Sequence, residues 1–134
     1  SLVNGSKGVI FWAYTSSRYN IYDHPEYWAY VKKMAGEIRD LTPVLTTPTI
    51  GDKLVVSLKN PAIQTMVKKV KGEWTVLTVN SSDKACDVSF QLPDLKDGSK
   101  INVLFEGRSL QVENGTWKDS FKPLEAHVYR LSAH

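Results

Sequence analysis

The hydrophobic pattern of this chain changes its period once, and that change most constrains the fold. Before residue 42, an unbroken apolar run is followed by apolar residues at spacings of three and four, as in a buried strand and then a helix. After residue 52, short apolar runs are separated by turn residues, as in a series of strands. We therefore expect two parts, a strand and helix in residues 1–45 and a β-sandwich in residues 46–134.

The first part is predicted to be one strand followed by one helix. The apolar and aromatic run 8–14 fits a strand that is covered on both faces, as in a parallel sheet. Asp23 is placed to cap the helix, Pro25 suits its first turn and Glu26 completes a capping box. Pro43 is expected to end it. One face of this helix carries Tyr27, Val31, Met34, Ile38 and Leu41.

The second part is predicted to contain about seven strands. Their expected ranges are 53–59, 63–71, 73–80, 85–92, 99–106, 109–113 and 125–131. Turn residues separate the runs, and Asn114-Gly115 is the strongest hairpin signal among them. The expected fold class is mainly β, an antiparallel β-sandwich of about seven strands preceded by one β-strand and one α-helix.

Composition excludes several classes of protein. The formal charge is only +3, and the basic residues gather only at Lys68, Lys69 and Lys71, which we expect to be a solvated strand end; nucleic acid is not an expected partner. The chain has no apolar run of the roughly 18 residues that a membrane helix needs, so a membrane is not expected either. The single cysteine, Cys86, alternates with Val88 and is predicted to be an inert core residue.

Taken in order, these pieces resemble the C-terminal region of (β/α)8-barrel glycoside hydrolases. Residues 5–12 resemble the last barrel strand and residues 25–45 the closing helix. Residues 103–108 and 117–131 resemble the closing strands of the β-sandwich domain that follows such barrels. The resemblance implies a parent enzyme that is bacterial and secreted or periplasmic, with its catalytic carboxylates on earlier barrel strands.

The residues themselves give no complete active site. Glycosidase chemistry needs two carboxyl groups about 5 to 9.5 Å apart across one sugar bond. Helix capping explains Asp23 and Glu26, and Glu106 and Arg108 are expected to form a structural ion pair. The histidines lack metal-ligand spacing, so no metal and no cofactor are expected. We therefore expect a chain that is not itself an enzyme.

Two functions stay open, a non-catalytic accessory domain that packs on the parent barrel, and a carbohydrate-binding module that uses exposed aromatic rings. The aromatic residues considered for carbohydrate contact are Trp12, Tyr14, Tyr19, Tyr22, Trp74 and Trp117. The resemblance implies that Trp12 lies at the sugar-facing end of the barrel strand. Tyr19 and Tyr22 belong to the polar loop 15–22, whereas Trp74 and Trp117 have core packing as their alternative.

The strand 8–14 leads to a further expectation about partners. Without a barrel around it, this strand and one face of the helix would expose apolar surface. We expect the strand either to add to an edge of the sandwich or to pair with a second copy of the chain.

Overall fold

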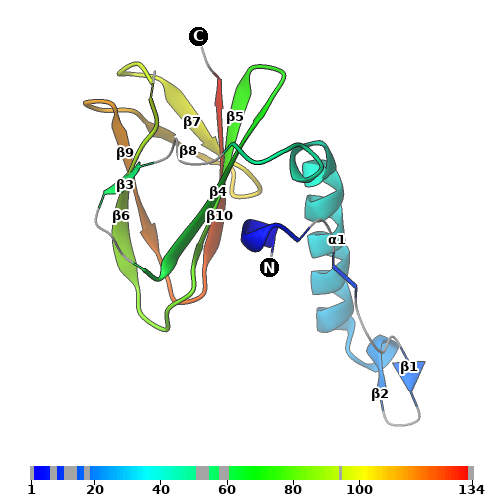
Figure 1. Cartoon of the computed structure of the whole chain (residues 1–134). Coiled ribbons are helices and arrows are strands. Elements are labelled where there is room, and N and C mark those ends of the chain that lie inside the picture. The colour runs from blue at the N-terminus through cyan, green and yellow to red at the C-terminus, as the bar shows by residue number, and fades with distance from the viewer. Residues whose placement is uncertain are drawn as a thin grey trace.

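The structure is a computed structural model that describes residues 2–6, 9–10, 15–16, 19–50, 55–57, 61–93 and 95–132. It contains one long helix beside a β-sandwich (Figure 1). The elements are, in order, η1 (Leu2–Asn4), β1 (Thr15–Ser16), β2 (Tyr19–Asn20), η2 (Ile21–Asp23), α1 (Pro25–Leu45), β3 (Val55–Ser57), β4 (Ile63–Val70), β5 (Glu73–Asn80), β6 (Cys86–Gln91), β7 (Lys100–Val103), β8 (Arg108–Gln111), β9 (Thr116–Phe121) and β10 (Ala126–Ser132).

Two antiparallel sheets form the sandwich. One has the strand order β4-β5-β10-β7-β8 and the other the order β3-β6-β9, while β1 and β2 pair by themselves. The predicted mainly β, antiparallel sandwich is confirmed. Each of the seven expected ranges overlaps one strand, and the described residues add an eighth, β9.

Strand β9 was not predicted as a separate apolar run, because an acidic residue occupies one of its inward positions. Trp117 and Phe121 are buried and lie four residues apart, so Asp119 falls on the same face between them. A strand with a carboxylate in the middle of its buried face does not show the apolar alternation on which strand prediction relies.

Aromatic rings fill the centre of the sandwich. The ring centroid of Phe90 lies 5.2 Å from that of Trp117 and 5.5 Å from that of Tyr129. All three side chains are fully buried, and they come from β6, β9 and β10 of the two sheets. These contacts join the sheets. Cys86 was expected to be a core residue. It is half-buried and packs at the edge of this core.

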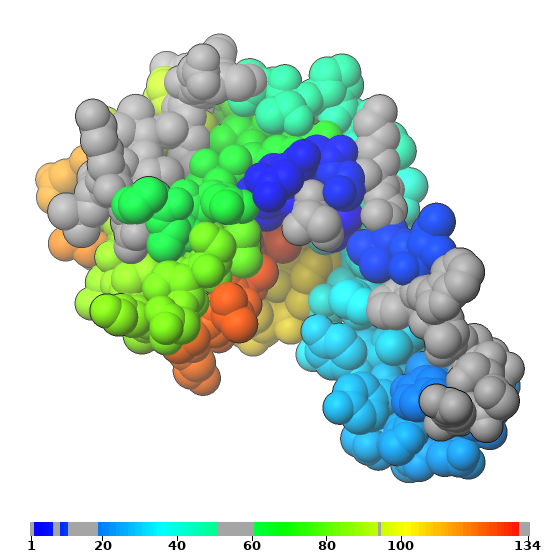
Figure 2. Space-filling view, turned by 60° about the horizontal axis from the view of Figure 1, so that its bottom comes forward, coloured from blue at the N-terminus to red at the C-terminus, as the bar shows by residue number. Residues whose placement is uncertain are grey.

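Only the C-terminal half of α1 packs on the sandwich. Leu41, Val44 and Leu45 are buried against Met66 and Leu77 of the five-stranded sheet. Toward the N-terminus, Val31 and Met34 of the predicted apolar face are half-buried and Tyr27 is exposed among the described residues, and this half of α1 extends away from the sandwich (Figures 1 and 2). Among the described residues, no helix combines the length and the apolarity needed to cross a membrane.

The ends of α1 differ in detail from the prediction. The helix begins at Pro25 as expected, but His24 is its N-cap residue and no side chain donates or accepts there. Asp23 instead ends the short helix η2, so the expected capping box is absent. Pro43 lies inside the last turn, and α1 continues to Leu45.

Lys68 closes the C-terminal end of α1 and is not solvated, contrary to our expectation. Its side chain is 4% exposed, and Nζ donates to the carbonyl oxygens of Leu45, at 3.0 Å, and Thr47. The last carbonyls of a helix have no donor within the helix, and they attract a positive charge. Lys68 therefore ties α1 to β4.

Replacing Lys68 by Met should lower the free energy of unfolding by about 2 kcal/mol, because two buried carbonyls lose a charged donor. Urea denaturation followed by circular dichroism measures this. Lys69→Met is the matched control, since Lys69 is exposed and holds its Nζ 4.5 Å above the Trp74 ring. It should cost less than about 1 kcal/mol. Equal losses in the two variants would contradict the capping role.

Candidate functional site

Aromatic side chains gather at the end of α1 that lies far from the sandwich. We call Tyr19, Tyr22, His24, Tyr27 and Trp28 the distal cluster. The ring of Tyr19 stacks on His24 with centroids 5.3 Å apart, and His24 meets the edge of Tyr27 at 5.9 Å. Tyr22 contacts Trp28 edge-on at 6.2 Å. Tyr22 and Tyr27 are 60% and 59% exposed, so the cluster presents ring surface to the outside.

Local backbone chemistry places this cluster. Asn20 caps η2, because its Oδ1 accepts a hydrogen bond of 3.1 Å from the backbone N–H of Tyr22. The cap turns the chain from β2 into η2 and then α1, which brings Tyr19 and Tyr22 of the expected loop to the first turns of the helix.

The other aromatic residues expected to contact sugar have different positions. Trp12 and Tyr14 lie outside the described residues, as does most of the strand expected at 8–14. Trp117 is 1% exposed in the sandwich core, and Trp74 is 6% exposed with Lys69 over its ring. Core packing is therefore the role that the structure gives these two tryptophans, because neither offers a free ring face.

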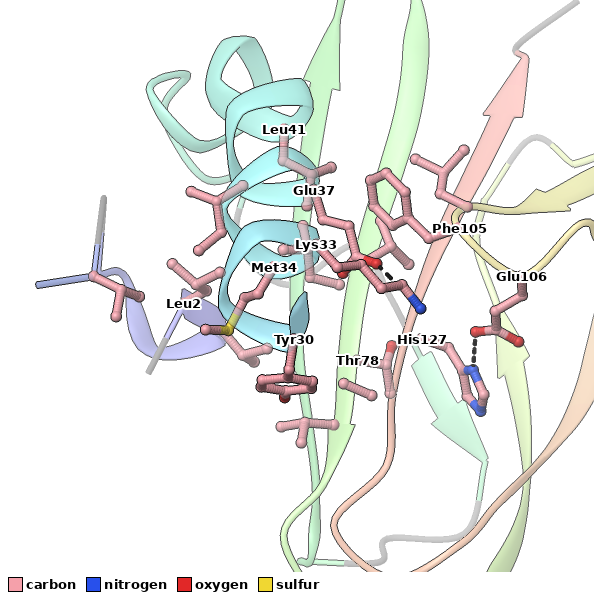
Figure 3. Close-up of a pocket in the computed structure, with 18 residues that line it drawn as sticks. Leu2, Tyr30, Lys33, Met34, Glu37, Leu41, Thr78, Phe105, Glu106 and His127 are labelled. Carbon is pink, nitrogen blue, oxygen red and sulfur yellow. Dashed lines mark hydrogen bonds and ion pairs between the residues drawn. The ribbon is translucent and has the colours of Figure 1, made fainter. Parts of the chain in front are cut away.

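A groove of about 450 Å³ runs between α1 and the five-stranded sheet (Figure 3). Its walls are mostly apolar, and they include Leu2, Met34, Ile38, Leu77, Phe105 and Val128. Lys33 and Glu37 form an ion pair of 3.9 Å on the helix side. The groove meets η1 and the exposed Val9, so the first part of the chain and the sandwich both contribute to it.

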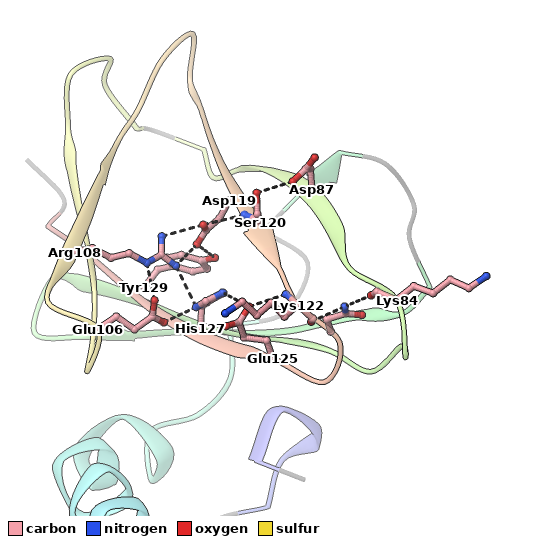
Figure 4. Close-up of polar contacts among 11 residues, drawn as sticks. Lys84, Asp87, Glu106, Arg108, Asp119, Ser120, Lys122, Glu125, His127 and Tyr129 are labelled. Atoms are coloured by element: carbon pink, nitrogen blue, oxygen red, sulfur yellow. Dashed lines mark hydrogen bonds and ion pairs between the residues drawn. The ribbon is translucent and has the colours of Figure 1, made fainter.

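A second cavity, which we call the polar pocket, lies at the sandwich beside the turn between β7 and β8 (Figure 4). Arg108 donates to both carboxylate oxygens of Asp119, at 2.9 and 2.8 Å, and from Nε to Glu106. Tyr129 donates its hydroxyl to Asp119 at 2.8 Å. Strands β8, β9 and β10 thus meet at one carboxylate. The expected ion pair between Glu106 and Arg108 is confirmed.

These contacts shift the pKa values of the three partners. Burial alone would raise the pKa of Asp119, but the hydrogen bonds from Arg108 and Tyr129 outweigh it, and the pKa lies below its ordinary value. The hydrogen bond to Asp119 raises the pKa of Arg108, and burial raises the pKa of Tyr129. All three groups therefore keep their usual charge at neutral pH.

His127 forms the wall between the polar pocket and the groove, since it lines both cavities. Its side chain is 4% exposed, and Nδ1 contacts the carboxylate of Glu106. Its Nε2 lies 3.6 Å from the carboxylate of Glu125 and has no hydrogen-bond partner among the described residues. Sequence analysis missed this residue, although His127, Tyr129 and Leu131 alternate along one buried face of β10.

The carboxylates at the centre of the polar pocket belong to one ion-pair network. Arg108 forms ion pairs with both Glu106 and Asp119. Within the described part of the chain, no group of three or more His, Cys, Asp or Glu side chains is placed to hold a metal ion.

The sequence matches no family model and no curated protein. The fold is similar to part of several solved structures. The α-amylase of Geobacillus thermoleovorans, complexed with acarbose, has a TM-score of 0.64 and 14% identity over 87% of this chain and 24% of its own. An Anoxybacillus α-amylase has a TM-score of 0.55 and 19% identity over 74% of this chain and 21% of its own. AmyP in complex with maltose has a TM-score of 0.56 and 17% identity over 77% of this chain and 21% of its own.

The chain thus spans less than a quarter of the length of these relatives. The shared feature is a fold, and it is the fold of a part of glycoside hydrolase structures, as the resemblance in sequence implied. The position of that part at the C-terminal end of a parent enzyme remains a prediction.

Proposed function

We propose that this chain is a non-catalytic accessory part of a glycoside hydrolase, in which residues 46–134 form a sandwich that packs on the catalytic barrel and stabilises it. The observation that carries this proposal is the exposed aromatic surface on the N-terminal half of α1, where Tyr27 of the predicted apolar face and the neighbouring Tyr30 are about 60% exposed. Aromatic surface of this extent favours a covering partner.

The two-part organisation supports the same proposal. The C-terminal half of α1 is fixed to the sandwich by Leu41, Val44 and Leu45, while its other half presents exposed tyrosines to a larger body. A helix held in this way would connect the barrel rigidly to the sandwich. The likeness to α-amylase structures, of which this chain covers less than a quarter, fits a part that adjoins a much larger remainder. We place the parent outside the cytoplasm, secreted or periplasmic, where polysaccharides are found.

A carbohydrate-binding module is the second candidate, and the distal cluster is the observation that favours it. Tyr22 is 60% exposed and Tyr19 stacks flat on His24, so rings are presented at the molecular surface. Sugar rings stack on aromatic faces of this kind. The two candidates differ in what the isolated chain should do.

If the chain is an accessory part, it should not hydrolyse polysaccharide, and it should not bind polysaccharide through the distal cluster. We expect no release of reducing sugar from starch or xylan, and a mobility in gels of either polymer that Tyr22→Ala leaves unchanged. Tyr22→Ala tests the distal cluster, and Tyr30→Ala, an equally exposed tyrosine outside that cluster, is its matched control.

Each other outcome has a definite meaning. Hydrolysis by the purified chain would overturn the accessory role. Retardation on one polymer that Tyr22→Ala abolishes and Tyr30→Ala leaves intact would establish the carbohydrate-binding module instead. Retardation that neither variant changes would place sugar contact away from the distal cluster.

A further inference from the structure

The polar pocket contains a buried nitrogen that the protein does not satisfy. His127 is 4% exposed, yet its Nε2 makes no hydrogen bond to any residue that the structure describes. Leaving a buried polar atom unpaired is costly, and an unpaired atom at the wall of a cavity indicates a missing partner. The nearest charged group is the carboxylate of Glu125 at 3.6 Å.

The contact with Glu106 determines which ring nitrogen of His127 carries the hydrogen. A carboxylate can only accept, so the contact between Glu106 and Nδ1 requires that Nδ1 donates. The Nη2 atom of Arg108, 3.2 Å from Nδ1, is also a donor, and that contact is therefore not a hydrogen bond. In the neutral imidazole, a ring that donates from Nδ1 accepts at Nε2.

Nε2 and the Glu125 carboxylate are then two acceptors that face each other. The Oε2 atom of Glu125 already accepts from the backbone N–H of Lys122 at 2.7 Å and has a second lone pair free for another donor. A group that satisfies both acceptors must carry two donors a short distance apart. Two neighbouring hydroxyls of a sugar meet this requirement, since one donates to Nε2 and the next to Glu125.

The charge of the pocket disfavours an anionic ligand. Its carboxylates, Asp87, Glu106, Asp119 and Glu125, are interleaved with the cations Arg108 and Lys122. An anion would meet four carboxylates, and a metal ion lacks a set of ligands in the described residues. A cavity of about 450 Å³ accommodates a small molecule.

We propose that the polar pocket binds one neutral sugar unit through a pair of vicinal hydroxyls held by His127 and Glu125. Nε2 is buried, so the side chain of Glu125, which is 31% exposed and lies 3.6 Å away, must rotate for a sugar hydroxyl to reach it. Ser120 and Asp87, joined by a hydrogen bond of 2.6 Å, form the outer rim. This site lies on the sandwich, apart from the distal cluster, and does not depend on the packing of a barrel.

The test is an NMR titration of the whole chain with methyl α-D-glucopyranoside, observed at the ring signals of His127. His24 reports separately on the distal cluster, because its ring stacks on Tyr19. We expect His127 to shift with a dissociation constant on the order of millimolar and His24 to stay unchanged. The fully O-methylated glucoside, which has no hydroxyl donors, should leave both unchanged.

Glu125→Gln is the decisive variant, because it replaces an acceptor with an amide donor that can satisfy Nε2 within the protein. It should weaken sugar binding about tenfold without loss of fold. Glu113→Gln, an exposed carboxylate outside the pocket, is the matched control and should bind as the unchanged chain does. Because Cys86 lines the same pocket, bound sugar should also slow its alkylation by iodoacetamide.

Three results would overturn the proposal. A His127 signal that no sugar moves would mean that water alone occupies the site. A shift caused by ethylammonium and not by the glucoside would assign the pocket to a cationic group. Equal sugar affinity in Glu125→Gln and Glu113→Gln would remove Glu125 from the site.

Discussion

Trp117→Ala is expected to lower the free energy of unfolding by about 4 kcal/mol, the largest effect of any single aromatic change in this chain. The indole is 1% exposed and packs on Phe90 and Tyr129, with centroids 5.2 and 5.8 Å away. Removing it opens a cavity between the two sheets, which the surrounding strands fill only in part. Urea denaturation monitored by circular dichroism measures the loss.

Two further variants separate packing from other effects. Trp117→Phe keeps a ring between the sheets and discards an N–H that has no acceptor among the described residues, so it should cost less than half as much. Tyr30→Ala, at an exposed position on α1, should change stability by less than about 1 kcal/mol. If Trp117→Ala kept full stability and lost affinity for a polysaccharide, the residue would be a sugar contact instead.

The sandwich could be predicted from the sequence because its strands follow local rules. Alternation such as Val88 and Phe90 against Asp87 and Ser89 places one face inward, and turn residues bound each run. The tight turn at Asn114-Gly115 was also correct, with Asn114 at φ 51° and Gly115 at φ 70°. It joins strands of different sheets, which no local pattern reveals.

Interactions between distant residues account for what the sequence missed. In the sequence, Lys68 belongs to a basic run that is typical of a surface. Its buried position depends on the end of α1, where the carbonyl of Leu45 accepts from its Nζ. Asp119 looks like a solvent residue, because its partners Arg108 and Tyr129 lie 11 and 10 positions away. A strand whose inward charge is neutralised by another strand cannot be recognised from its own residues.

The candidate site shows the same limit. Glu106 and Arg108 could be paired from their spacing of two. The polar pocket adds residues of β9 and β10 and of the turn before β10, and their approach depends on strand order. For the distal cluster, the sequence identified Tyr19 and Tyr22, because aromatic residues in a polar loop stand out. Their stacking on His24 depends on the turn at Asn20.

Asp119→Asn should lower the free energy of unfolding by about 3 kcal/mol at neutral pH. The substitution leaves the guanidinium of Arg108 without its bidentate partner and weakens the acceptor for the buried hydroxyl of Tyr129. Arg108 is 35% exposed, so water replaces part of what it loses, and the effect stays below that of a fully buried pair.

The loss should also depend on pH, with a sign set by the lowered pKa of Asp119. A carboxylate whose pKa is lower in the folded state stabilises that state fully above its unfolded pKa of about 4 and loses this contribution as the pH falls through the folded value. The difference between the native chain and Asp119→Asn should therefore be constant from neutral pH down to about pH 5, and should shrink below about pH 4. Urea midpoints across this range test the prediction, with Asp83→Asn, an exposed carboxylate, as the matched control that should show no such difference. A gap that stays constant to the lowest pH at which the chain folds would mean that Asp119 contributes through packing and not through its charge.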